Sequence, residues 1–192
     1  MAESVIFIII ALVIIVAILY AFNLTWIDPR IIFAFVMLAI LPGIYAAFTS
    51  GPFVPSSAKR YKIMIGLAKL KSNDVVCDLG CGDGRLVFSA APLVKKAIGY
   101  ELSIPLYLYG KLISIFKSPK AEIRYGNIWK QDYSGMDVIF IYLLPCSMKK
   151  FHREIWPKLK PGTRVISNAF QIFDLKPVIQ EEKVYLYKKS ID

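Results

Sequence analysis

The chain has 192 residues, enough for one ordinary domain and an appendage, and a formal net charge of +10. Hydrophobic residues make up 56% of it, and its mean hydropathy of +0.52 is high for a water-soluble domain. Its three cysteines, Cys77, Cys81 and Cys146, form no CxxC pair, and His152 is the single histidine. We therefore expect no bound metal, and free thiols in a reducing compartment.

The excess of apolar residues lies in two runs near the N-terminus, residues 5–22 and 31–48, each of 18 residues without a charge. A helix of that length measures roughly 27 Å, close to the thickness of the hydrocarbon core of a bilayer. We predict a transmembrane helical hairpin with helices at about 5–22 and 31–48. A signal peptide is the alternative for the first run, and Pro42 leaves open whether the second fully spans the bilayer.

The flanking charges predict an orientation. Lys59, Arg60 and Lys62 follow the second run, whereas the connecting segment 23–30 holds one Asp and one Arg. The positive-inside rule then predicts a two-span membrane protein with its C-terminal domain on the cytosolic side. We divide the chain into an anchor (1–50), a linker rich in Pro and Ser (51–58) and a domain (59–192).

The domain is strongly basic. Only Glu3, Asp28 and Arg30 precede Lys59, so the remainder carries about +11. Such a charge suits the anionic surface of a membrane, and equally suits a nucleic acid.

Strand and helix patterns alternate along the domain. Strands are predicted at 74–78, 97–102, 121–125, 137–144 and 163–167, and helices at 57–70, 86–91, 104–116 and 147–159. Residues 176–189 read as two strands with a tight turn near 181–183, and only the short segment 171–175 precedes them. The pattern predicts an α/β fold, with a parallel sheet between helices and a closing antiparallel hairpin.

The segment DLGCGDG, residues 78–84, places three glycines where the first strand should turn into a helix. Gly80 allows a tight turn, Gly82 lets the backbone approach a ligand, and Gly84 permits close packing of helix on strand. The spacing is not GxGxxG, and Asp78 and Asp83 would repel a pyrophosphate. A cationic ligand with a primary amine suits Asp78 better, and S-adenosylmethionine is such a ligand.

Polar residues also end the next two strands. Glu101 lies 23 residues after Asp78, where a carboxylate can accept hydrogen bonds from both ribose hydroxyls. Asn127 follows the third strand, where it could meet the adenine amino group or serve as a plain turn residue.

DLGCGDGR followed by GYE resembles the cofactor motifs of class I S-adenosylmethionine-dependent methyltransferases, which have a Rossmann-like seven-stranded sheet ending in an antiparallel hairpin. The chain is further similar to a small family of protein-lysine methyltransferases. That family includes mitochondrial membrane enzymes acting on the ATP synthase c-subunit and the adenine nucleotide translocase, and archaeal enzymes of broad specificity. The similar stretches are FVPSS (53–57), DVVCDLGCGDGRLV (74–87), IGYEL (98–102), YGN (125–127), YLLP (142–145), PKLKPGTRVIS (157–167) and VYLY (184–187).

The resemblance implies which residues form the site. Cofactor contacts are expected at Asp78, Gly80, Cys81, Gly82, Glu101 and Asn127, and a substrate channel near Phe53, Val54, Pro55, Tyr142 and Pro145. The chain departs from the family at two positions: it has Asn168 where the family tends to carry His, and Leu175 where a Trp precedes Pro.

The segment after the fourth strand bears on the acceptor. Enzymes that methylate nucleobase amines commonly place [DNS]-P-P-[YFW] there, whereas this chain has Tyr142-Leu143-Leu144-Pro145. An apolar mouth suits a lysine side chain and favours its neutral amine. No catalytic base is evident; Tyr142 is the best candidate for orienting the amine, or else a core residue. Cys146 is expected to begin a helix rather than to attack a cytosine ring.

We therefore interpret the chain as a membrane-anchored, S-adenosylmethionine-dependent methyltransferase of protein lysines, with its protein substrates in or beside a membrane. The alternatives are methylation of a lipid or membrane-dissolved small molecule, the less favoured methylation of a nucleic acid, and a non-enzymatic scaffold.

Overall fold

The computed structural model describes residues 28, 30–34, 37–38, 41, 44–45 and 57–190. The expected span 5–22, much of the expected span 31–48, and the channel residues Phe53, Val54 and Pro55 lie outside these residues. Within the described part of the chain, no helix combines the length and the apolar character that crossing a bilayer requires.

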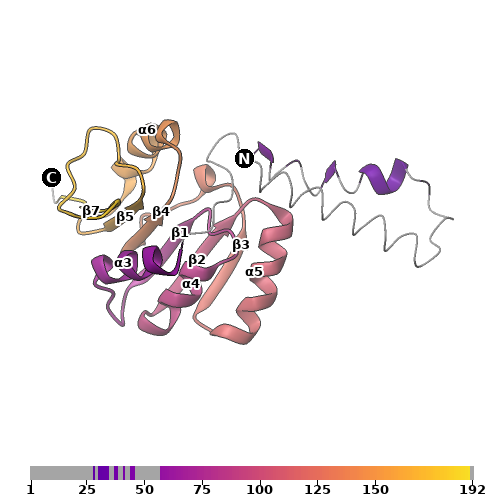
Figure 1. The fold of residues 1–192 in the computed structure, drawn as a ribbon, viewed down its shortest axis with the longest axis horizontal. Helices are drawn as coiled ribbons and strands as arrows, with labels where there is room; N and C mark the ends of the chain where they lie inside the picture. Colours follow the sequence, from indigo (N-terminus) through magenta and orange to yellow (C-terminus); the bar gives the residue numbers. More distant parts are fainter. Residues whose placement is uncertain are drawn as a thin grey trace.

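The domain is built on one seven-stranded sheet in the order β3-β2-β1-β4-β5-β7-β6 (Figure 1). Neighbouring strands from β3 to β5 run parallel, and β7 runs antiparallel to both β5 and β6. This confirms the predicted Rossmann-like sheet with a closing hairpin. The strands are β1 (Val75–Leu79), β2 (Lys96–Glu101), β3 (Ala121–Tyr125), β4 (Val138–Ile141), β5 (Arg164–Asn168), β6 (Ile179–Glu181) and β7 (Val184–Lys188).

Helices cover both faces of the sheet. On one face, α3 (Ala58–Ala68) and α4 (Arg85–Ala90) contribute Met64, Leu67 and Val87 to a core with alternate residues of the strands. On the other, Met148 and Phe151 of α6 (Pro145–Glu154) pack with the remaining strand residues. Helix α5 (Ile104–Lys117) packs mainly along β3, at one edge of the sheet (Figure 1). Short 3-10 turns occur at Ala91–Leu93, Ile128–Lys130 and Trp156–Lys158.

The fourth strand is shorter than the sequence predicted. The expected strand 137–144 ends at Ile141, and α6 begins at Pro145, two residues before the expected start. Proline has no backbone N–H to donate and its fixed φ suits the first helical position, while the residue before it favours extended backbone. Leu144 accordingly has φ −62° and ψ 156°, and Tyr142 lies in the loop between the strand and the helix.

The segment between β5 and β6 contains no helix in the described structure, as the shortness of residues 171–175 predicted. The turn between β6 and β7 falls at Glu182 and Lys183, also as predicted, and Glu182 adopts φ +51°.

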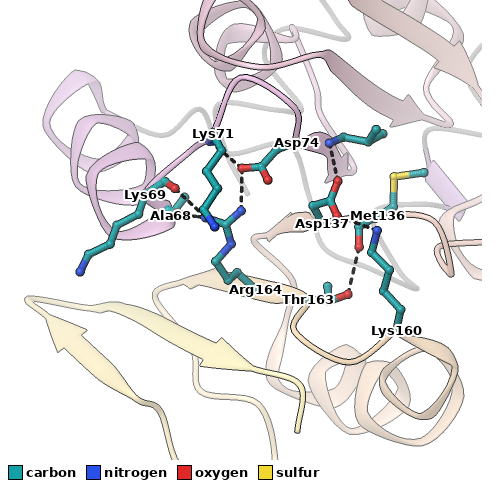
Figure 2. Close-up of polar contacts among 10 residues, drawn as sticks. Ala68, Lys69, Lys71, Asp74, Met136, Asp137, Lys160, Thr163 and Arg164 are labelled. Atoms are coloured by element: carbon teal, nitrogen blue, oxygen red, sulfur yellow. Dashed lines mark hydrogen bonds and ion pairs between the residues drawn. The ribbon is translucent and has the colours of Figure 1, made fainter. Parts of the chain in front are cut away.

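A polar network closes the amino ends of the central strands (Figure 2). Arg164, at the start of β5, forms an ion pair of 2.6 Å with the buried Asp74. Its other guanidinium nitrogen donates to the carbonyls of Ala68 and Lys69, which end α3. The Asp74 carboxylate also accepts from the backbone N–H of Lys71 at 2.7 Å. One arginine thus ties a helix end, a loop and a strand together.

Replacing Arg164 with methionine should destabilise the domain strongly. The substitution keeps much of the apolar stem but leaves the Asp74 carboxylate buried without its cation, which typically costs about 3–5 kcal/mol. Chemical unfolding of the purified chain measures this loss.

Lys160→Met is the matched control. Lys160 pairs with Asp137 at 2.6 Å in the same network, but both side chains are much more exposed. Such a pair contributes about 0–1 kcal/mol. Equal losses in the two variants would contradict the role given to Arg164.

Candidate functional site

Strand register brings the predicted cofactor residues together at the carboxyl ends of the strands. Leu79 of β1 lies opposite Tyr100 of β2 and Ile141 of β4. Glu101, the next residue of β2, lies opposite Tyr125 of β3. The chain leaves β1, β2, β3 and β4 at this end of the sheet. The predicted site residues lie here: Asp78, Gly80, Glu101, Asn127 and Tyr142. The carboxyl ends of the strands are where ligands bind in open α/β sheets.

The glycine turn between β1 and α4 is held by the neighbouring strand. The backbone N–H groups of Gly80 and Cys81 both donate to the Tyr100 carbonyl at 3.0 Å. Gly84, with φ +79°, leads into α4, and a Cβ there would lie 2.8 Å from the Phe88 ring and 3.1 Å from Ile123. Any larger residue at position 84 would therefore be strained both by its backbone and by its neighbours.

Glu101 is buried beneath this turn. One carboxylate oxygen accepts from the Gly82 N–H at 2.8 Å, and the other accepts from the Leu102 and Ser103 N–H groups at 2.9 and 2.7 Å. Burial raises the pKa of Glu101, although these three hydrogen bonds oppose the rise. The sequence pointed to a carboxylate for a ribose; it did not reveal that Glu101 also fixes the glycine turn.

Asp78 is the second buried carboxylate of the site. Burial raises its pKa to about 7, and the nearby charges of Glu101 and Asp83 add to the effect. Among the described residues, no hydrogen-bond donor or cation contacts its side chain. A buried anion without a partner is costly, so a cation that bound here would remove part of that cost.

Asp83 belongs to a different interaction. Its carboxylate is bidentate with the Arg85 guanidinium at 3.0 and 2.5 Å. The sequence suggested that Asp83 would repel a pyrophosphate, but much of its charge is balanced by the arginine two residues later. Asp78 and Glu101 therefore carry the negative charge of the site.

Asn127 and Tyr142 lie after the carboxyl ends of β3 and β4. The Asn127 side-chain oxygen accepts from the Trp129 N–H at 2.9 Å and so begins the short turn after β3. Tyr142 is 37% exposed in the loop between β4 and α6, so it is not a core residue. Its role in orienting the amine stays a prediction. Cys81 is buried, and burial raises the pKa of its thiol. Its backbone N–H donates to the Tyr100 carbonyl and its carbonyl accepts from the Gly84 N–H, so Cys81 helps to hold the glycine turn.

A cavity of about 490 Å³ opens beside the start of α6. Pro145 and Lys149 line it from α6, and Gln171 to Lys176 line it from the connection between β5 and β6. The Lys149 Nζ atom lies 4.7 Å from the centroid of the Phe173 ring. The predicted channel residue Pro145 thus meets Leu175, one of the two departures from the family pattern, in one cavity. Sequence spacing alone did not indicate this.

Comparison with known proteins identifies the family. A model of the ANTKMT methyltransferase domain matches residues 78–179, from the first carboxylate of the site to the first residue of β6. The chain belongs to this methyltransferase family. The resemblance drawn from its motifs is therefore confirmed.

Individual relatives agree with this assignment. A protein-lysine N-methyltransferase of Saccharolobus islandicus is 37% identical over 149 residues, 71% of this chain and 92% of the relative. The mouse adenine nucleotide translocase lysine N-methyltransferase is 28% identical over 130 residues, 66% of this chain, and the match spans just over half (56%) of that relative's length.

Among solved structures, an RNA methyltransferase from Salinibacter ruber in complex with S-adenosyl-L-homocysteine is 28% identical, with a TM-score of 0.69. The alignment covers 72% of this chain and 95% of that one.

S-adenosylmethionine is the cofactor of this methyltransferase, and the residues at the strand ends fit it. The Asp78 carboxylate, which no donor or cation among the described residues contacts, suits the ligand's amino group and positive charge. Glu101 can accept from ribose hydroxyls. A Cβ built at Gly80 would meet no described atom within 4 Å, so the backbone there is open to a ligand. When bound, the cofactor supplies an electrophilic methyl group on a sulfonium.

Asp78→Asn should stabilise the cofactor-free domain at pH 8. The folded-state pKa of about 7 lies above the ordinary value of 3.8, so the folded chain binds the proton more tightly and loses stability as pH rises between these values. Asparagine does not ionise and escapes that loss, on the order of 2–4 kcal/mol. Thermal unfolding measures this difference. Equal stability of both proteins at pH 8 would contradict a buried Asp78 that has no partner among the described residues.

Cofactor affinity should depend on the same proton. Below pH 7 the free protein's Asp78 becomes protonated, so S-adenosylmethionine should bind up to about tenfold more weakly per pH unit. At pH 8, Asp78→Asn and Glu101→Ala should each weaken binding by about 1.5–3 kcal/mol. Calorimetry measures both effects.

Glu122→Gln is the control for this titration. Glu122 lies near the amino end of β3 in an ion pair with Arg124, away from the carboxyl ends of the strands where the site residues lie. The affinity and pH profile of this variant should match those of the unaltered chain. If Asp78→Asn and Glu101→Ala also bind S-adenosylmethionine with unchanged affinity, the cofactor binds elsewhere on the protein.

Proposed function

We propose that the chain is a protein-lysine N-methyltransferase. The observation that carries the proposal is the 37% identity to the archaeal protein-lysine N-methyltransferase over 92% of that relative's length. An identity of this extent, over nearly the whole of a relative, favours a shared acceptor class.

The acceptor side of the site supports this choice. Tyr142 and Pro145 follow β4, and Pro145 lines the adjoining cavity. The other walls of the cavity combine apolar and aromatic side chains with polar and charged ones: Ile172, Phe173, Leu175, Gln171, Asp174, Lys149 and Lys176. The loop between β4 and α6 offers no Asp or Asn side chain to hydrogen-bond a nucleobase amine. Apolar and aromatic walls suit the methylene stem of a lysine.

The residues of the chain would position the two reactants rather than supply a strong base. An apolar opening lowers the pKa of a lysine amine and favours its neutral, nucleophilic form. The Tyr142 hydroxyl can orient that amine toward the cofactor end of the sheet. Much of the rate would then come from holding the two reactants in line.

We further propose that residues 5–22 and 31–48 anchor the enzyme in a membrane, with the domain on the cytosolic side. Two uncharged runs of 18 residues and the basic residues after the second run support this. Residues 49–59 would reach at most roughly 40 Å, so lysines near the bilayer would be met at high effective concentration. The acceptors would then be lysines in membrane proteins, at loops close to the bilayer.

An RNA acceptor is the second candidate. The similar Salinibacter ruber structure is named an RNA methyltransferase, and the domain's charge of about +11 would attract a polyanion. The loop after β4, which carries no base-reading motif, argues against it.

Transfer of label from radioactive S-adenosylmethionine distinguishes these acceptors. The purified chain, incubated with membranes and total RNA, should label protein, and the label should reside on lysine by mass spectrometry. Asp78→Asn, which retains the acceptor side, should lose at least about tenfold of this activity through weakened cofactor binding.

Label in RNA or in extracted lipid, with none on lysine, would overturn the lysine proposal. Lysine labelling confined to soluble proteins, with membrane proteins present, would leave the activity standing and contradict the membrane acceptors.

A further inference from the structure

Helix α5 leaves five large apolar residues exposed, while the residues that it buries most completely are small, the reverse of an ordinary surface helix. Gly110 and Ser114 are buried. Ile115 and Phe116 face outward, 72% and 79% exposed. The other large apolar residues of this outward face, also more than half exposed, are Leu108, Tyr109 and Leu112.

These five residues form a continuous stripe. At about 100° per residue they fall within an arc of roughly 120° on the outer side of the helix. Scattered apolar residues on a protein surface are ordinary, but a contiguous apolar face marks an interaction site. We call residues 108, 109, 112, 115 and 116 the α5 face.

Basic residues border the α5 face on both sides. At the same angular spacing Lys111 lies about 40° beyond one margin of the stripe, and Lys117, the exposed last residue of the helix, lies about 80° beyond the other. The helix contains no Asp or Glu, and neither lysine is ion-paired with a described residue. An apolar stripe between lysines is the pattern of a helix that lies in the plane of a membrane interface.

We propose that the α5 face docks on an anionic lipid bilayer, with its apolar side chains among the acyl chains and Lys111 and Lys117 at the headgroups. The charge favours this occupant over a second copy of the chain, because two α5 faces in contact would bring unpaired lysines together. The net charge of the domain acts in the same direction.

Docking through α5 would set the orientation of the active site. Helix α5 begins at Ile104, three residues after Glu101, and runs along β3 at the sheet edge (Figure 1). A helix lying in the interface therefore keeps the cofactor end of the sheet beside the lipid surface. This orientation is independent of the proposed hairpin and of which acceptor is methylated.

Site-specific quenching tests the contact in the whole chain. A fluorophore is attached at Leu112→Cys or Ile115→Cys in a Cys146→Ser background, since Cys77 and Cys81 are buried. The chain is reconstituted in phosphatidylglycerol-containing vesicles that carry a lipid-attached quencher. Gln180→Cys on β6, at the opposite edge of the sheet, is the matched control.

Labels at 112 and 115 should be quenched from the lipid and shielded from a water-soluble quencher, and the label at 180 should behave in the opposite way. Lys111→Gln with Lys117→Gln should lower the ratio of docked to undocked helix by about fivefold per lysine, while a neutral phosphatidylcholine bilayer should also weaken docking. Labels at 112 and 115 as accessible to water as the label at 180 would overturn the proposal. So would shielding from both quenchers, because protein would then cover the face.

Discussion

The cofactor site depends on two buried carboxylates at the carboxyl ends of adjacent parallel strands. Asp78 and Glu101 are both buried, and burial raises the pKa of each. Glu101 is satisfied by three backbone N–H groups, one of them from the glycine turn. Asp78 has no such partner among the described residues. A cationic ligand such as S-adenosylmethionine would supply the positive charge that the described residues do not place beside Asp78.

The two ends of β1 place an aspartate in opposite electrostatic environments. Asp74, just before the strand, is paired with Arg164 and with the Lys71 N–H. Asp78, four residues later, is buried and, within the described structure, left without a cation. The first arrangement locks α3, the loop and β5 together, and the second holds charge ready for a ligand. Stability and binding are thereby separated along a single strand.

The sequence predicted the sheet well because its signals are local and repeated. Alternating strand and helix patterns, the glycines of residues 78–84 and the carboxylate at 101 each carry their meaning within a short segment. The predicted end of β4 was wrong by three residues because Tyr142 to Leu144 continue the apolar strand pattern, and only the backbone limits of Pro145 end it.

Features that depend on contacts across the fold were not predictable. The Asp83–Arg85 pair, the hydrogen bond from Gly82 to Glu101 and the cavity beside Phe173 all need three-dimensional placement. The same holds for α5. Its apolar residues predicted a helix, but nothing in their periodicity said that the small residues would turn inward. The membrane anchor, most of which lies outside the described residues, stays a prediction from sequence.

A structure of the chain with S-adenosyl-L-homocysteine tests most directly whether Asp78 and Glu101 hold the cofactor. We predict the ligand at the carboxyl ends of β1 and β2, with its amino group within about 3 Å of the Asp78 carboxylate and its ribose hydroxyls within that distance of Glu101. A ligand bound elsewhere, or with neither carboxylate in contact, would show that Asp78 and Glu101 do not hold the cofactor.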